Sequence, residues 1–266
     1  MAQLFDDVFN SKSIHEMLFF NLKSVLIHST LLALEKENKP MFERWSYLAK
    51  TKYKFDIKTV HDNTDAMIDA QRVYEQHAPY YPEFSRINAI TYATVYMENG
   101  KLKRYMKKIV NEDEFIVLAT FTEELYQLSS DGIKSSPQYF PILCGHNILR
   151  YDIPHFVKKH VLYKDRFEKG LPLIIKKNLD VKPWESGVID TVNVWKFNGY
   201  DYMPLMLISD FLGLKKTVDL LPLDEVSKQY WEMVSTDEEK ALEFVSLQSA
   251  TQTNLVIQLM NRLRQL

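Results

Sequence analysis

Residues 141–154 read PILCGHNILRYDIP, and this stretch carries the fold prediction. Its first four residues form a short apolar run of the length of a buried strand, and a helix is predicted from residue 153. A strand that leads through a turn into a helix is typical of α/β proteins, in which ligand sites lie beyond the carboxyl ends of the strands. Asp152 falls at such a position and is the first candidate for a functional residue.

The rest of the chain continues the alternation of strands and helices. Further strands are predicted at 18–25, 87–96, 102–110 and 188–191, with a hairpin turn at Glu98-Asn99-Gly100. Helices are predicted at 1–17, 112–130, 153–161 and 237–266, and residues 29–78 are predicted to be a helical insertion. This order predicts an α/β protein with a mixed central sheet of about five strands flanked by helices. We expect one domain over residues 1–266.

The composition excludes several classes of protein. The chain of 266 residues is 46% hydrophobic with a formal net charge of −2, so any nucleic-acid site would be a local basic patch. Only seven glycines are present, and no Gly-rich phosphate loop occurs. The single cysteine, Cys144, has no partner for an intramolecular disulfide. A single cysteine favours a reducing, cytoplasmic setting. Since no apolar run approaches the ~18 residues of a membrane span, we expect a soluble protein without a membrane partner.

The run Gly145-His146-Asn147, followed by an aromatic residue and then Asp152-Ile153-Pro154, closely resembles the second exonuclease motif of the proofreading domain in B-family DNA polymerases. Residues 82–87 and 182–197 resemble neighbouring regions of stand-alone bacterial relatives. The resemblance covers roughly residues 18–263. It implies an RNase H-like fold in its exonuclease variant.

The same resemblance implies a chemistry and the residues that perform it. Two divalent cations hydrolyse the phosphodiester, and holding them close together requires several convergent carboxylates. At four of the five matching positions the expected group is replaced: Asn21 for aspartate, Lys23 for glutamate, Phe244 for tyrosine and Gln248 for aspartate. Only Asp152 is retained. The ammonium of Lys23 would also repel a metal ion by several kcal/mol at an effective dielectric constant of ~20.

These replacements favour an exonuclease-like protein that is catalytically inactive and binds single-stranded nucleic acid weakly at most, with no metal cofactor. One alternative is an active 3′–5′ exonuclease in which Asp152, Asp190 and rearranged ligands hold Mg²⁺ or Mn²⁺. Another alternative is a protein-interaction module on an exonuclease scaffold. DNA and RNA are not distinguished by the sequence.

Side chains around the degenerate site also have expected positions. Asn21 and Lys23 lie two residues apart on one strand and share a face. The resemblance implies that this face points at Asp152, so Lys23 is expected within ion-pair reach of Asp152, directly or through one water. Gln248 is expected to close the same cavity with hydrogen bonds. His146 and Asn147 are the candidate nucleic-acid contacts, although the resemblance gives the histidine a mainly structural role.

Other residues have a structural and a functional interpretation side by side. Cys144 and His146 are expected to be a satisfied buried pair rather than a nucleophilic dyad. Asp190 is expected to cap a helix or turn, with metal ligation as the alternative. Trp184 and Trp195 are expected in the core. A basic tract is either a nucleic-acid patch or a solvated face; it consists of Lys101, Lys103, Arg104, Lys107 and Lys108.

Overall fold

The structure is a computed structural model that describes residues 13–57, 64–133, 141–179, 187–197 and 199–265. The chain divides into two compact units. The first unit contains residues 1–23, 88–220 and 245–266, and the second contains residues 24–87 and 221–244. The expectation of one domain stays a prediction, since each unit is defined by itself.

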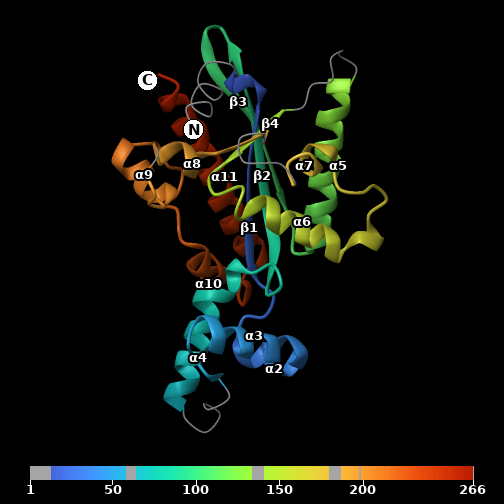
Figure 1. The fold of residues 1–266 in the computed structure, drawn as a ribbon, viewed down its shortest axis with the longest axis vertical. Coiled ribbons are helices and arrows are strands. Elements are labelled where there is room, and N and C mark those ends of the chain that lie inside the picture. The colour runs from blue at the N-terminus through green and yellow to red at the C-terminus, as the bar shows by residue number, and fades with distance from the viewer. Residues whose placement is uncertain (1–12, 58–63, 134–140, 180–186, 198, 266) are drawn as a thin grey trace. The chain divides into compact units, whose positions relative to one another are not determined.

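A five-stranded mixed sheet with the strand order β3-β2-β1-β4-β5 forms the framework of the first unit (Figure 1). Strand β1 pairs in parallel with β4 and β4 pairs in parallel with β5, whereas β2 and β3 form an antiparallel hairpin. The predicted mixed sheet is confirmed. The strands are β1 (Met17–Leu26), β2 (Ser85–Glu98), β3 (Lys101–Val110), β4 (Ile142–Gly145) and β5 (Val188–Asp190).

The predicted hairpin turn is also confirmed. Asn99 and Gly100 both have positive φ, at 52° and 71°. Two consecutive residues in this region are what a type I′ turn requires, and Asn-Gly adopts it with little strain. The turn therefore fixes the register in which Glu98 pairs with Lys101.

Helices cover both faces of the sheet. Helices α5 (Glu114–Ile133) and α6 (Asp152–Leu162) lie on one face, and α11 (Glu238–Leu263) lies on the other (Figure 1). Every residue of β1 is buried, as expected for a strand covered on both faces. Phe20 contacts Phe121 of α5 with ring centroids 5.5 Å apart, while Phe19 belongs to the apolar cluster that includes α11. Alternate side chains of β1 thus pack against α5 on one face of the sheet and against the cluster with α11 on the other.

The remaining elements of the first unit are short. They are η2 (Ile14–Glu16), η5 (Lys164–Arg166), α7 (Leu173–Lys176), α8 (Thr191–Trp195) and α9 (Leu205–Leu212). Residues 1–12 of the predicted N-terminal helix lie outside the described residues. The helix predicted at 1–17 is wrong over its last residues. Residues 14–16 form a single 3-10 turn, and Met17 already pairs with Ile142 in the sheet. Burial of the Met17 side chain in the core favours the strand there.

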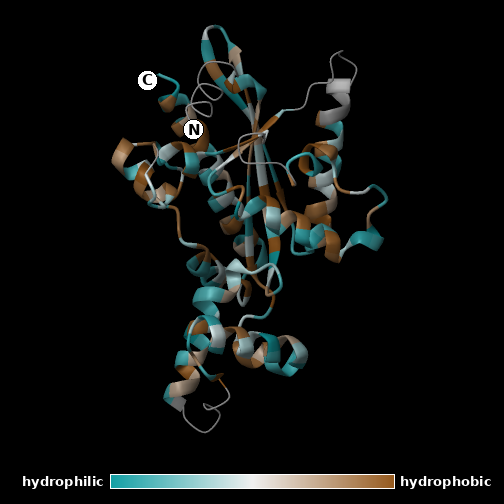
Figure 2. Cartoon of the chain, in the orientation of Figure 1, coloured by the Kyte–Doolittle hydropathy of each residue, from teal (hydrophilic) through white to brown (hydrophobic). Residues whose placement is uncertain are grey.

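The second unit is helical, as predicted for residues 29–78, of which 58–63 are not described. Its helices are α2 (Leu31–Glu37), α3 (Lys39–Lys52), α4 (Thr64–His77), η4 (Ala78–Tyr80) and α10 (Leu223–Val234). Trp45 is fully buried at its centre, with its ring centroid 5.4 Å from Tyr74 and 5.3 Å from Phe84. Hydrophobic and hydrophilic residues alternate around these helices (Figure 2), which is the pattern of helices that bury one side.

Among the residues that the structure describes, no helix is both long and apolar enough to cross a membrane. Trp195 is half-buried and packs against the core of the first unit, in agreement with its prediction. Trp184 lies outside the described residues.

Candidate functional site

The turn after β4 positions Asp152, and Gly145, the last residue of β4, has no room for a side chain. A Cβ on Gly145 would lie 2.9 Å from the Ile148 Cβ and 3.0 Å from the backbone oxygen of Phe20 on β1. Two residues later, Asn147 has φ 64°, and its carbonyl accepts hydrogen bonds from the backbone N–H groups of Arg150 and Tyr151. Asparagine adopts the left-handed region more readily than most residues. The backbone conformation of this turn thus accounts for glycine at position 145 and asparagine at position 147.

Asp152 is the first residue of α6 and is buried. Its Oδ1 accepts hydrogen bonds from the Leu22 backbone N–H at 2.8 Å and from the Asn21 Nδ2 at 3.1 Å. Burial raises the pKa of Asp152 to about 7, against the opposing effects of the Leu22 hydrogen bond and the Lys23 charge. The carboxyl group therefore titrates near neutral pH.

Asn21 is buried beside this carboxyl group. Its amide nitrogen donates to Asp152, while its Oδ1 is buried without a hydrogen-bond partner among the described residues. A buried acceptor without a partner is energetically unfavourable.

Lys23 lies on the same side of β1 as Asn21, as predicted. Its Nζ donates to the Gln252 Oε1 on α11 at 2.6 Å, and it forms no direct ion pair with Asp152, which is also a described residue. Burial lowers the pKa of Lys23 to about 8, and the Asp152 charge opposes that shift. The two groups therefore interact electrostatically, although the direct hydrogen bond of Lys23 goes to Gln252, which the prediction did not include; an approach to Asp152 through one water stays a prediction.

Helix α11 presents a polar stripe to β1. The Ser249 hydroxyl donates to the backbone oxygen of Asn21 at 3.0 Å. Gln248 is buried and its Nε2 donates to the Asp219 backbone oxygen at 2.9 Å. Gln252 follows Gln248 by four residues, so the two side chains lie on neighbouring turns of one helix face. That spacing was the signal by which Gln252 could have been identified. Phe244, one turn before Gln248, is half-buried.

Asp190 caps the N-terminus of α8, as expected, and also accepts hydrogen bonds from the turn after β4. Its Oδ1 accepts from the backbone N–H groups of Asn147 at 2.8 Å and Val192 at 3.0 Å, and its Oδ2 accepts from Leu149 at 3.2 Å. Burial is the main cause that raises its pKa. Because three backbone donors already use its oxygens, Asp190 is poorly suited to ligate a cation as well.

His146 is buried within the same turn. Its Nε2 lies 3.1 Å from the Met203 backbone oxygen and its Nδ1 lies 2.9 Å from the Thr191 hydroxyl. Burial lowers the pKa of His146 to about 4, so the ring is neutral at pH 7. The carbonyl can only accept, so Nε2 carries the proton. Both ring nitrogens are engaged by the protein, and a role of His146 in nucleic-acid contact stays a prediction.

Two neighbours complete the site. The Cys144 side chain is fully buried, and burial raises the pKa of its thiol, in agreement with a core role for the pair with His146. Tyr202, which the sequence prediction omitted, has its ring centroid 6.2 Å from that of His146. Burial is the first cause of its raised pKa, followed by the charges of Asp190 and Asp152. Tyr202, which is about half exposed, thus lies close enough to both carboxyl groups for their charges to act on its hydroxyl.

The side chains present do not fit a pair of divalent cations. Asp152 and Asp190 are the only carboxylates brought together from the predicted set, and the ammonium of Lys23 stands among them. Within the described parts of the chain, no group of three His, Cys, Asp or Glu side chains is placed to hold a metal ion. Hard cations require more oxygen ligands than this site offers.

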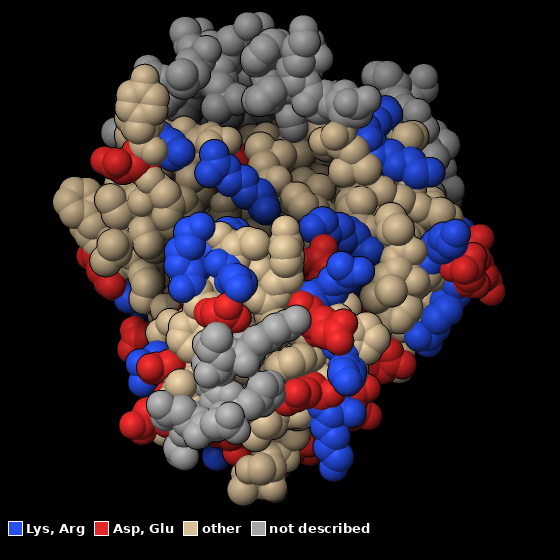
Figure 3. All heavy atoms as spheres, turned by 60° about the horizontal axis from the view of Figure 1, so that its bottom comes forward, with Lys and Arg blue, Asp and Glu red and all other residues tan. Residues whose placement is uncertain are grey.

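The basic tract on β3 is partly neutralised. Lys107 donates to Glu124, Lys103 lies 3.9 Å from Glu98, and Arg104 donates to Asn254. Lys101 and Lys108 are exposed. Because acidic side chains pair with two of its lysines, the tract offers little concentrated positive charge. The face drawn in Figure 3, which brings the lower end of Figure 1 forward, also has basic and acidic side chains interspersed.

Comparisons of the chain with protein-family models, with curated proteins and with solved structures each gave no match.

Proposed function

We propose that this chain is a catalytically inactive protein of the 3′–5′ exonuclease type, built on an RNase H-like fold, that binds single-stranded nucleic acid weakly at most. The observation that carries the proposal is the contact set of Lys23 and Asp152. An ammonium donates to Gln252 and an amide donates to Asp152 where the resemblance expects carboxylates and metal ions. The mixed sheet flanked by helices is compatible with the proposed fold.

The polar residues that replace the expected carboxylates form hydrogen bonds within the chain. A cluster of uncompensated carboxylates would repel itself without metal ions. Asn21 and Lys23 remove two of the expected negative charges, and Lys23 adds a positive one. The resulting metal-free cluster satisfies most of its hydrogen-bonding groups within the chain.

Activity tests the proposal directly. Labelled single-stranded DNA and RNA should not be shortened by the protein with Mg²⁺ or Mn²⁺, because removal of one electrostatic catalytic group already costs about 10²–10³ in rate. Asp152→Ala is the matched control, since any trace of activity that it does not remove comes from a contaminating nuclease. A 3′–5′ ladder that disappears with Asp152→Ala would establish the active alternative with Asp152 and Asp190 as ligands.

A second candidate function, a protein-interaction module, is favoured by an exposed apolar patch in the first unit. Phe211 and Leu207 lie four residues apart on α9 and are 80% and 53% exposed. The Trp195 ring lies between Phe211 and Phe197, at centroid distances of 6.3 and 5.8 Å. Clusters of exposed aromatic side chains are common at protein interfaces. Replacing Phe211 with serine should leave the melting temperature unchanged but weaken any protein complex that this patch forms.

A further inference from the structure

The second unit contains a half-open cavity of about 240 Å³ that the exonuclease-like proposal does not use. Its walls come from the end of β1, the start of α2, and helices α4 and α10. The polar and aromatic side chains that define its character are Ser29, Glu75, Asp224, Lys228, Trp231 and Glu232. All of them belong to the second unit.

Hydrogen bonds fix the wall that α10 contributes. The Trp231 Nε1 donates to the backbone oxygen of Leu26 at 3.1 Å, and the Ser227 hydroxyl accepts from the Leu26 N–H at 2.9 Å. These bonds hold α10 against the end of β1. With its N–H engaged, Trp231 contributes an indole ring to a wall that exists before any ligand binds.

The cavity wall carries the carboxylates of Glu75, Asp224 and Glu232, none of which forms an ion pair within 4 Å among the described residues. Glu75 accepts from the neutral Gln71 amide at 2.6 Å, and Asp224 accepts from the Tyr80 hydroxyl at 3.1 Å. Lys228 lines the cavity but forms no ion pair with any residue that the structure describes. Glu75 and Asp224 are half-buried with neutral partners, whereas Glu232 is exposed. Half-buried carboxylates of this kind attract a cation from solution.

The arrangement selects the kind of cation. No three carboxylates among the described residues converge as metal ligands do, so a bare divalent ion is not favoured. The volume is below the ~300–1,000 Å³ of pockets for drug-sized ligands, which limits the occupant to a small group. A guanidinium combines a planar set of donors for carboxylates with a surface that stacks on indole.

We propose that this cavity binds a guanidinium group, presented by a small free ligand or by an arginine side chain of a protein partner. Carboxylates of the wall would accept its N–H groups. Trp231 would pack against its plane, in the way that the Arg86 guanidinium already lies over this ring with its carbon 5.5 Å from the ring centroid. The proposal rests on the second unit alone and is independent of the exonuclease-like assignment.

Calorimetric titration of the whole chain tests the proposal with three probes. Agmatine represents the free ligand, an acetylated Gly-Arg-Gly amide represents the side chain, and the same peptide with citrulline is the neutral isostere. We expect either cationic probe to bind in the millimolar range or tighter, with the indole N–H resonance of Trp231 shifting on binding. Tighter binding of the peptide indicates a protein partner, and tighter binding of agmatine indicates a free ligand.

The double variant Glu75→Gln, Asp224→Asn keeps the shape of the wall and removes two charges, so affinity should fall at least about tenfold. Glu225→Gln is the matched control, because Glu225 is the next residue on α10 and does not line the cavity. If the double variant does not fold, Glu232→Gln should still weaken binding. Equal binding of the citrulline peptide, or no heat and no resonance shift with either cation, would overturn the proposal.

Discussion

At the scale of single residues, Asp152 makes the stability of the protein depend on pH. Burial raises its pKa from an ordinary value of 3.8 to about 7, and this value already includes the attraction of Lys23. Between these two values the folded state keeps a proton that the unfolded state releases. The contribution of Asp152 to the free energy of unfolding therefore falls as the pH rises from about 4 to 7 and is constant above that range.

Asp152→Asn should remove this dependence, because asparagine keeps the shape of the neutral carboxyl group and cannot ionise. We expect the variant to match the wild type near pH 4 and to become more stable than it toward pH 8, by up to a few kcal/mol. Urea unfolding at several pH values measures the difference. Asp165→Asn, at an exposed aspartate of η5, is the control. Curves for wild type and Asp152→Asn that run parallel over this pH range would contradict the account.

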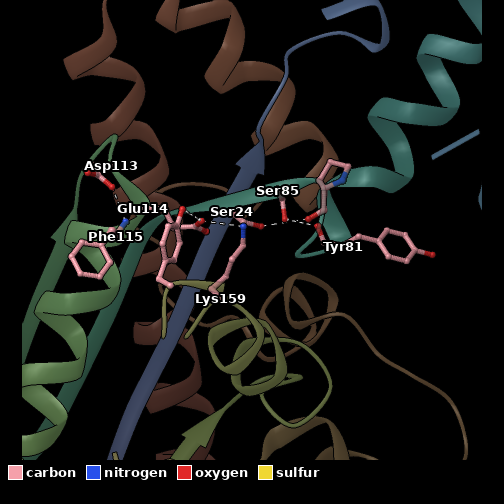
Figure 4. A network of polar contacts seen from close by, with 9 residues as sticks. Ser24, Tyr81, Ser85, Asp113, Glu114, Phe115 and Lys159 are labelled. Atoms are coloured by element: carbon pink, nitrogen blue, oxygen red, sulfur yellow. Dashed lines mark hydrogen bonds and ion pairs between the residues drawn. The ribbon is translucent and has the colours of Figure 1, made fainter. Parts of the chain in front are cut away.

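At the scale of elements, a buried ion pair joins α5 to α6. The Lys159 Nζ lies 3.0 Å from the Glu114 Oε2, with the two side chains 2% and 5% exposed (Figure 4). The Tyr163 hydroxyl donates to the same carboxylate at 3.1 Å. At the start of α5, the Asp113 carboxylate accepts a hydrogen bond from the Phe115 N–H at 2.8 Å. This cluster joins the start of α5 to the last turn of α6 and the residue that follows it.

Lys159→Met should leave the Glu114 carboxylate buried without its cation and lower the free energy of unfolding by roughly 3–5 kcal/mol. Adding Glu114→Leu should recover much of the loss, since two apolar groups replace a buried pair with little penalty. Denaturant unfolding measures both effects. The Lys169–Glu123 pair also involves α5 at 2.8 Å, but its side chains are about half exposed, so Lys169→Met should change stability little. Equal effects of the two lysine variants would refute the role given to burial.

At the scale of the whole molecule, charge limits the affinity for nucleic acid. The net charge is −2, and acidic or polar partners already engage much of the β3 tract. We expect a labelled single-stranded oligonucleotide to bind with roughly micromolar or weaker affinity at low salt, and affinity to fall steeply as salt is added. Fluorescence anisotropy measures both.

Lys101→Glu with Lys108→Glu should weaken that binding further, whereas Lys39→Glu, in the other unit, serves as the control. The absence of any anisotropy change at low salt would remove the nucleic-acid part of the proposed function. It would then favour the protein-interaction candidate and its patch around Trp195.

The sequence by itself determined the five strands, the helices α5, α6 and α11, and the local turns, but not the helices α7, α9 and α10. Alternation placed β1, β2 and β3, the Asn99-Gly100 pair specified the hairpin, and the end of β5 identified Asp190 as a cap. These features depend on residues that are close along the chain, where periodicity and backbone preference act directly. The period of two in β1 also sufficed to place Asn21 and Lys23 on one face.

Only the tertiary structure decided which distant groups meet. Lys23 and Gln252 are 229 residues apart in the sequence. Gln252 becomes the partner of Lys23 because of the position at which α11 packs along β1. The pairing of Lys159 with Glu114 likewise depends on how two helices pack across one sheet face. The N-terminal helix prediction failed at Met17 for the same reason, because pairing with β4 and burial in the core outweighed a local helical pattern. Contacts of this kind depend on the packing of whole elements, which short-range sequence patterns do not encode.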